Sequence, residues 1–212
     1  KILVPSNYVK NLLVKEWKIQ NEKIEVTYEA VDHKILSISK IKISESTDAV
    51  KKFGIQPPYI LYVGNAHPHK NVEGLIKVFR KLKEKYPDLK LVLSGYDHYF
   101  WQRLRDENAH EGIIYTGYVD DEQLVALYKG AEVFVLPSFE EGFGIPLLEA
   151  MACSTPVVSS NAGALPEVGG DACVYFDPRD STDMVDKINQ VLKSAKLRKD
   201  LIENGQKRYQ LF

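Results

Sequence analysis

The segment SFEEGFGIPLLEA, residues 138–150, decides the fold because it joins an apolar strand to an apolar helix through a turn with two glycines. The strand is expected over 132–136, and the helix is expected to begin near Pro146, where the missing N–H of proline costs nothing. The glycines let the backbone approach a ligand closely. The free N–H groups and the positive dipole end of the helix favour an anion. The segment therefore predicts a phosphate site at the carboxyl end of a parallel sheet.

Two glutamates, Glu141 and Glu149, flank this predicted anion site and lie eight residues apart. A carboxylate beside a phosphate is unfavourable unless it binds hydroxyl groups. A nucleotide sugar carries hydroxyl groups on both sides of its pyrophosphate, on the ribose and on the transferred sugar. The alternative is an ordinary connection between a strand and a helix, in which Glu149 is a solvated helix residue.

The whole segment resembles the E-x7-E signature of retaining GT-B glycosyltransferases, and of glycosyltransferase family 4 in particular. The resemblance continues through EAMACSTPVV, residues 149–158, and GALPEVGGD, residues 163–171. It covers the chain from about Tyr59 onward. It implies an enzyme of two Rossmann-like domains with the active site between them, of which this chain is the C-terminal, donor-binding half.

An alternation of strands and helices begins at Tyr59 and indicates an α/β fold with a doubly wound, Rossmann-like parallel sheet. Asn71 is expected to cap the first helix of this part, which Pro87 ends. Strands are expected at 59–63, 89–93, 113–116, 133–136, 157–159 and 173–176. The later helices are expected at about 99–109, 121–129, 146–153, 181–194 and 197–209.

The first 32 residues differ from this pattern and look like the last strand, helix and strand of the N-terminal half of the family fold. Ser6 is expected to cap a helix that runs to about Trp17. Residues 33–56 are interpreted as a connector, with 33–46 as a polar connector or exposed loop. The nucleotide-sugar-binding domain then occupies residues 57–212.

The composition excludes several classes of protein. The 212 residues carry a net charge of −1, which argues against nucleic acid as a partner. No apolar run approaches the roughly 18 residues that span a bilayer. The only cysteines are Cys153 and Cys173, which favours the reducing cytoplasm. Peripheral association with a membrane stays open, because lipid-linked acceptors are typical of the family.

The loop from Gly64 to Lys70 lies between the first strand of the domain and its helix, where such a sheet binds phosphate. Lys70 is expected to put a positive charge on the pyrophosphate. Asn65 stands where many family members carry an arginine. Although His67 and His69 are two residues apart, no carboxylate or cysteine has ligand spacing nearby, and the chain has no Asp-x-Asp triplet. We expect neither a metal nor a cofactor.

The resemblance implies a role for each candidate residue. Glu149 would hold the ribose hydroxyls and Glu141 those of the transferred sugar, so that Glu141, with Lys70, is a candidate catalytic residue through positioning rather than covalent attack. Phe143, Gly144 and Leu147 would offer backbone N–H groups. The remaining predicted donor-binding residues are Gly64, Asn65, Gly142 and Ile145, together with Gly95, Tyr118 and Val119 near the base.

Three further residues are expected to be structural. Ser154 stands where the family usually has glycine, and at a positive φ it would cost about 1 kcal/mol. Glu167 is expected to be structural rather than catalytic. Cys153 is expected to lie in the core rather than act as a nucleophile.

The implied reaction is transfer of a hexose, with retained anomeric configuration, to the hydroxyl of a saccharide or lipid-linked acceptor. GDP-mannose is the favoured donor, followed by a UDP-hexose. The acceptor would bind to the missing N-terminal half, so the chain alone should bind donor without turnover. The alternatives are a non-catalytic nucleotide-binding or scaffold module and, third, a sugar-nucleotide epimerase or a phosphorylase.

Overall fold

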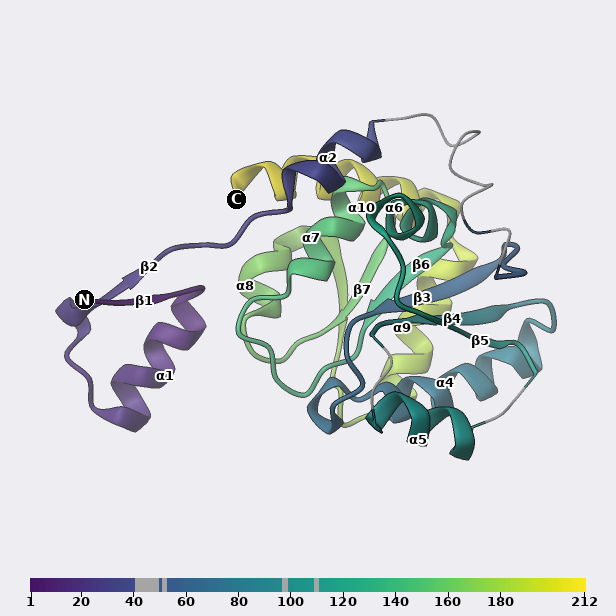
Figure 1. Cartoon of the computed structure of the whole chain (residues 1–212), viewed down its shortest axis with the longest axis horizontal. Coiled ribbons are helices and arrows are strands. Elements are labelled where there is room, and N and C mark those ends of the chain that lie inside the picture. The colour runs from purple at the N-terminus through teal and green to yellow at the C-terminus, as the bar shows by residue number, and fades with distance from the viewer. Residues whose placement is uncertain (41–49, 51–52, 97–98, 109–110) are drawn as a thin grey trace.

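The computed structural model describes residues 1–40, 50, 53–96, 99–108 and 111–212. Its main feature is a six-stranded parallel sheet in the order β5-β4-β3-β6-β7-β8 (Figure 1). This sheet confirms the expected Rossmann-like α/β fold. The strands are β3 (Tyr59–Val63), β4 (Lys90–Ser94), β5 (Ile113–Gly117), β6 (Val133–Leu136), β7 (Val157–Ser160) and β8 (Cys173–Phe176).

The order of the strands places a switch point between β3 and β6. Strand β3 pairs with β4 on one side, with Ile60 opposite Leu91, and with β6 on the other, with Ile60 opposite Val133. The chain builds the sheet outward from β3 in one direction and then returns to add β6 on its other side. Ligands of such sheets bind beyond the carboxyl ends of the strands at this point.

Helices cover both faces of the sheet. Figure 1 shows α4 (Val72–Lys85), α5 (Tyr99–Glu107) and α9 (Ser181–Lys193) on one side, and α6 (Asp121–Gly130) and α7 (Ile145–Ala152) on the other. Helix α10 (Ala195–Arg208) packs against α7, and the short α8 (Leu165–Gly169) follows β7. Four 3-10 turns complete the described structure: Asn21–Lys23, Pro68–Lys70, Gly170–Ala172 and Tyr209–Leu211.

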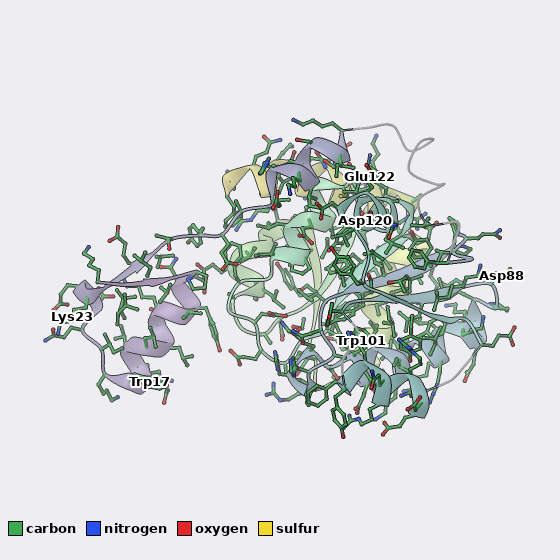
Figure 2. The ribbon with its side chains drawn as sticks, in the orientation of Figure 1. Trp17, Lys23, Asp88, Trp101, Asp120 and Glu122 are labelled. Atoms are coloured by element: carbon green, nitrogen blue, oxygen red, sulfur yellow. The ribbon has the colours of Figure 1, made fainter. Side chains whose placement is uncertain are left out.

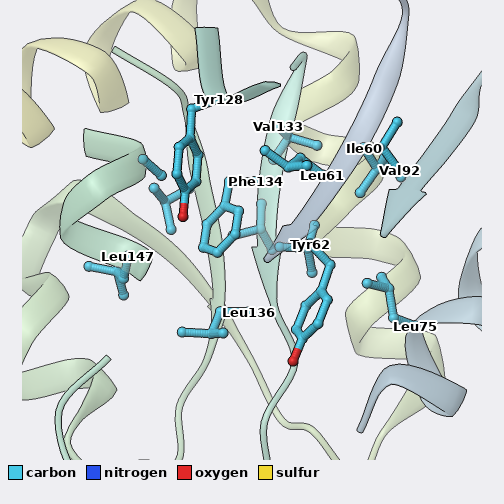
Figure 3. Packing of buried hydrophobic residues seen from close by; sticks show 14 of the residues in the cluster. Ile60, Leu61, Tyr62, Leu75, Val92, Tyr128, Val133, Phe134, Leu136 and Leu147 are labelled. Carbon is cyan, nitrogen blue, oxygen red and sulfur yellow. The ribbon is translucent and has the colours of Figure 1, made fainter. Parts of the chain in front are cut away.

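The core lies between the sheet and these helices. Phe134 in β6 is fully buried, and its ring meets that of Tyr128 from α6 at a centroid distance of 5.5 Å (Figure 3). Asp120 and Gln123 form a capping box at the start of α6, whose N-cap is labelled in Figure 2. The start of α6 and the position of Tyr128 are thereby fixed. Among the described helices, none has both the length and the apolar character to cross a membrane.

Residues 1–26 form a separate small unit beside the six-stranded sheet (Figure 1). Strand β1 (Ile2–Val4) pairs in parallel with β2 (Ile24–Val26), and α1 (Asn7–Trp17) connects them. Ser6 caps α1 as expected, since its hydroxyl accepts a hydrogen bond from the Val9 N–H at 3.2 Å. Trp17, at the outer end of α1, is 73% exposed (Figure 2).

The expected exposed loop over 33–46 is wrong at its beginning. Residues His33–Ser39 form helix α2, which Asp32 caps through a hydrogen bond from the Lys34 N–H at 2.8 Å. Ile35 is only 3% exposed because α2 packs against α6 and α7. The rest of the expected connector falls largely on residues 41–49 and 51–52, and the expected end of the helix at Ala109 falls on 109–110, outside the described residues.

Candidate functional site

A pocket of about 350 Å³ opens at the carboxyl ends of β3 and β6. It therefore lies at the switch point of the sheet. The N-terminal unit contributes Pro5 to the wall of the pocket, and the linker after this unit contributes Glu29. The lining residues are Pro5, Glu29, Val63, Gly64, Asn65, Lys70, Leu136, Glu141, Gly142, Phe143, Gly144, Ile145 and Pro146.

Lys70 and Glu141 face each other inside this pocket. The Lys70 Nζ lies 2.8 and 2.9 Å from the two carboxylate oxygens of Glu141, and the Ser138 hydroxyl donates to the same carboxylate at 2.8 Å. The two charged side chains are 17% and 11% exposed, so each compensates the charge of the other where little water reaches. A lysine ammonium has three N–H donors, and Lys70 therefore keeps the capacity to bind an anion as well.

Two hydrogen bonds tie the loop of Lys70 to the loop of Glu141. Asn71 Nδ2 donates to the carbonyl of Pro137 at 3.1 Å, and the Phe139 N–H donates to the carbonyl of His69 at 2.7 Å. Asn71 occupies the N-cap position of α4 as expected, and its carbonyl accepts the N–H of Leu75 at 3.2 Å, but the expected side-chain cap is wrong: the side chain makes no cap hydrogen bond, and φ is +55°. Its amide group joins the loops that carry the two charges instead.

Gly163, in the loop after β7, packs closely against the backbone of Glu141. A Cβ atom at position 163 would lie 2.4 Å from the Glu141 carbonyl oxygen, and φ at Gly163 is +61°. The next residue, Ala164, donates its N–H to that same carbonyl at 2.9 Å. Only glycine allows this approach, so the loop after β7 holds Glu141 at the pocket.

The start of α7 presents free backbone donors to the pocket. Gly144, with φ at +105°, turns the chain into the helix. Within the described part of the chain, the N–H groups of residues 142–145 have no protein acceptor. The N–H of Leu147 donates to the Gly144 carbonyl at 3.0 Å, so the expected donation by Leu147 to a ligand would compete with this bond. The free N–H groups and the helix dipole suit an anion.

Glu149 lies one helical turn beyond Ile145, outside the lining of the pocket. Its carboxylate accepts a hydrogen bond from the hydroxyl of the fully buried Tyr128 at 2.9 Å. Burial raises the pKa of Glu149, the nearby Asp121 and Asp32 raise it further, and the Tyr128 hydrogen bond opposes them. Among the described residues, no cation forms an ion pair with Glu149.

The residues expected near the base stand at the ends of β4 and β5. Gly95 abuts the pocket loop, since a Cβ atom there would lie 1.9 Å from the carbonyl oxygen of Gly64. Tyr118 is 72% exposed, and Val119 packs partly against the core. The structure thus brings Gly95 next to Gly64 but leaves the Tyr118 ring in solvent.

His67 and His69 stack on each other with their ring centroids 5.9 Å apart. Burial, together with the charge of Lys70, lowers the pKa of His69. In the described ranges, no group of three His, Cys, Asp or Glu side chains has the arrangement of a metal site.

The structure also assigns site positions to residues that the sequence did not single out. Ser138 binds Glu141, Tyr128 binds Glu149 and Gly163 supports the Glu141 backbone. Ser138 stood in the quoted segment, three residues before Glu141, and could have been found from that spacing. Tyr128 and Gly163 are distant in sequence, and no local pattern connects them with the glutamates.

The sequence pattern of the family described as glycosyl transferases group 1 matches residues 44–208. O-antigen chain mannosyltransferase B of Escherichia coli is 49% identical over 131 residues, which cover 58% of this chain and 33% of that protein. O-antigen chain mannosyltransferase RfbU of Salmonella typhimurium is 31% identical over 181 residues, which cover 84% of this chain and 47% of that protein. The chain therefore spans between a third and a half of the length of these two relatives.

Solved structures share the fold. WaaG, a glycosyltransferase involved in lipopolysaccharide biosynthesis, superposes with a TM-score of 0.83 at 18% identity over 100% of this chain and 59% of that one. The Anabaena HepE protein in complex with UDP-glucose gives 0.85 at 17% identity, over 99% and 58% of the two chains. These likenesses confirm the fold of one half of a GT-B glycosyltransferase. With the family pattern extending over most of its length, the chain belongs to the glycosyl transferases group 1 family.

Proposed function

We propose that this chain is the donor-binding half of a retaining hexosyltransferase that uses a nucleotide diphosphate sugar. The observation that carries the proposal is the pocket at the switch point, which the Lys70–Glu141 pair lines together with the start of α7, whose N–H groups have no acceptor among the described residues. This pocket combines positive donors for a diphosphate with a carboxylate that can bind sugar hydroxyls. Both features are needed to hold the junction between a diphosphate and a hexose.

The diphosphate would lie between Lys70 and the backbone of residues 142–145. The N–H groups there are fixed before the ligand arrives, so little reorganisation accompanies binding. When the bond between the sugar and the phosphate breaks, negative charge grows on the departing diphosphate. Donors aimed at that charge stabilise the transition state, and Lys70 would supply the full positive charge among them.

The two glutamates would divide the hydroxyl groups of the donor between them. Glu141 lies in the pocket and would orient the transferred sugar, acting by position rather than by covalent attack. Glu149 lies farther along α7 and would accept hydrogen bonds from the ribose. Burial is the main cause of its raised pKa, and ribose hydroxyls would supply donors in addition to the hydroxyl of Tyr128.

The proposed donor is GDP-mannose, with a UDP-hexose as the second candidate. Two relatives at 49% and 31% identity carry mannosyltransferase names, which favours mannose. The proposed reaction uses no metal, because Lys70 and the helix N–H groups provide the positive charge. The acceptor, a saccharide or a lipid-linked saccharide, would be bound by the other half of the enzyme, so the chain alone should bind donor without transferring the sugar.

Thermal unfolding with excess GDP, UDP or ADP, each with EDTA and with magnesium, tests the proposal. A nucleotide at one hundred times its dissociation constant adds about 2.7 kcal/mol of stability, or about 5–10 °C for a chain of this length. We expect the largest shift with GDP, unchanged by EDTA.

Lys70→Met should abolish the shift, and the exposed Lys81→Met on α4 serves as the matched control. A shift that survives Lys70→Met would place the nucleotide elsewhere. The absence of a shift with every nucleotide would favour the scaffold alternative.

A further inference from the structure

Glu167, on the short helix α8, accepts four hydrogen bonds from the N-terminal unit and its linker. Its carboxylate receives the backbone N–H of Asn7 at 2.8 Å, the side-chain amide of Asn7 at 2.9 Å, the N–H of Tyr8 at 2.9 Å and the hydroxyl of Tyr28 at 3.1 Å. Two of these donors are the first N–H groups of α1, which have no acceptor within their own helix. Residues 160 positions apart are thus joined at one carboxylate.

The carboxylate is suited to this contact in charge as well as in position. The negative charge of Glu167 meets the positive dipole end of α1. Partial burial alone would raise the pKa of Glu167, but the hydrogen bonds from Asn7, Tyr8 and Tyr28 outweigh it and lower the pKa. On the other side, Arg208 holds the α8 backbone by donating to the carbonyls of Glu167 and Val168.

The same end of α1 touches the pocket loop. The hydroxyl of Ser6, which is fully buried, donates to the Gly142 carbonyl at 2.7 Å. The Tyr8 hydroxyl donates to the Glu140 carboxylate. The ring of Tyr28 lies against that of Phe143 with centroids 6.2 Å apart. A movement of α1 away from Glu167 would therefore pull on residues 140–143, which carry Glu141 and the N–H groups of the pocket.

We propose that Glu167 is a positioning residue that clamps the start of α1 against residues 140–143 and thereby holds the wall of the donor pocket. The expected effect of Glu167 on nucleotide affinity rests on the proposed function, whereas its expected effect on residues 140–143 does not. The clamp differs from a purely structural contact because its loss should loosen the pocket loop while the sheet stays intact.

Amide hydrogen exchange of the ligand-free chain, followed by NMR, tests the clamp. Glu167→Gln keeps the shape of the side chain but removes its negative charge and replaces one of the two carboxylate oxygens with an N–H₂ group, so that one set of donors loses its acceptor. Glu203→Gln on α10 is the matched control, because Glu203 is exposed and pairs with Lys199 one turn away on the same helix. We expect exchange about tenfold faster at Asn7, Tyr8 and Phe139 in Glu167→Gln, with Val92 in β4 unchanged.

GDP affinity measured by calorimetry supplies the second readout. Glu167→Gln and Ser6→Ala should each weaken GDP about fivefold, and the double variant should be little weaker than either, because both act through Gly142. Unchanged exchange at Phe139, or an equal increase at Val92, would overturn the clamp. If exchange changes as expected but the wild-type chain binds no nucleotide, the clamp stands and the proposed function fails.

Discussion

Glu141 and Glu149 have the same charge and lie on one loop-helix unit, yet their surroundings differ. Glu141 accepts hydrogen bonds from the Lys70 ammonium and the Ser138 hydroxyl. Glu149 accepts a hydrogen bond from the neutral hydroxyl of Tyr128, has no ion-pair partner in the part of the chain that the structure describes, and has its pKa raised by burial. The charge of Glu141 is therefore balanced in the ligand-free protein, whereas that of Glu149 is not.

This difference indicates that the two carboxylates carry different costs for the fold. Glu141 belongs to a pair whose separation would leave a charge in a poorly hydrated site. Glu149 is a carboxylate held largely out of water, and in the proposed function this cost to stability serves the binding of a ligand. Variants that remove one partner at a time test whether the two carboxylates differ in this way.

The largest effect is expected from Lys70→Ala. It leaves the Glu141 carboxylate, 11% exposed, without its ammonium partner and should lower the free energy of unfolding by about 3 kcal/mol. The double variant Lys70→Ala/Glu141→Gln should recover most of this loss, because it removes the stranded charge. Urea unfolding of the single and the double variant measures these free energies. An equal loss of stability in both variants would contradict the pairing of Lys70 with Glu141.

Glu149→Gln is expected to weaken GDP binding ten- to a hundredfold, because it removes a charged acceptor for the ribose hydroxyls. Calorimetry with GDP and with 2′,3′-dideoxy-GDP measures the effect. The dideoxy analogue lacks those hydroxyls, so its weaker affinity should barely change with the substitution. An equal loss of affinity for both nucleotides would show that Glu149 does not bind the ribose hydroxyls.

The same substitution should stabilise the ligand-free chain at neutral pH by on the order of 1 kcal/mol. The folded-state pKa of Glu149 is raised above its usual value of 4.5, so the folded state disfavours the carboxylate. Well below pH 4.5 Glu149 is protonated in both states and costs nothing; the cost grows as the pH rises from about 4.5 to the folded-state pKa and stays constant above it. The stability difference between Glu149→Gln and wild type should grow over that window, and a constant difference would contradict the raised pKa.

Tyr128→Phe is expected to weaken GDP about fivefold by removing the hydroxyl that donates to the Glu149 carboxylate. In the Glu149→Gln background the substitution should have a smaller effect, because both changes act on one contact. Calorimetric titration of the two single variants and the double variant gives this coupling. Fully additive losses would show that Tyr128 affects the site by another route.

The smallest effect is expected from Ser154→Gly. Ser154 has φ at +60°, so glycine should relieve about 0.5–1 kcal/mol, less the hydrogen bond that its hydroxyl accepts from Gln206. GDP affinity should stay unchanged, which distinguishes this stabilising change from Glu149→Gln. A chemical denaturation curve measures the gain in stability, and a calorimetric titration with GDP measures the affinity.

Local sequence patterns predicted the sheet and the order of its elements well. Each strand is a short apolar run bounded by polar or glycine residues, and the proline and glycines around α7 specify its start. Helix α2 was missed because seven residues are too few to establish a helical period, and Ile35 is the one of its three apolar side chains that is fully buried. Its helical state depends on contact with α6 and α7 rather than on periodicity.

The candidate site was predicted only in part, since its charges are balanced by residues distant in sequence. The segment 138–150 indicated an anion site with two glutamates but not that Lys70, 71 residues away, binds Glu141. Likewise, Asn71 was a plausible cap, and only the tertiary structure turns its amide toward Pro137. The clamp at Glu167 joins residues 160 apart and has no local signature.

Calorimetric titration of the wild-type chain and of Lys70→Ala with GDP and with GMP tests the proposed diphosphate site most directly. If Lys70 and the start of α7 bind the diphosphate, the wild type should prefer GDP over GMP by about tenfold or more, and Lys70→Ala should lose most of that preference. A preference that is unchanged in Lys70→Ala, or absent from the wild type, would contradict the account.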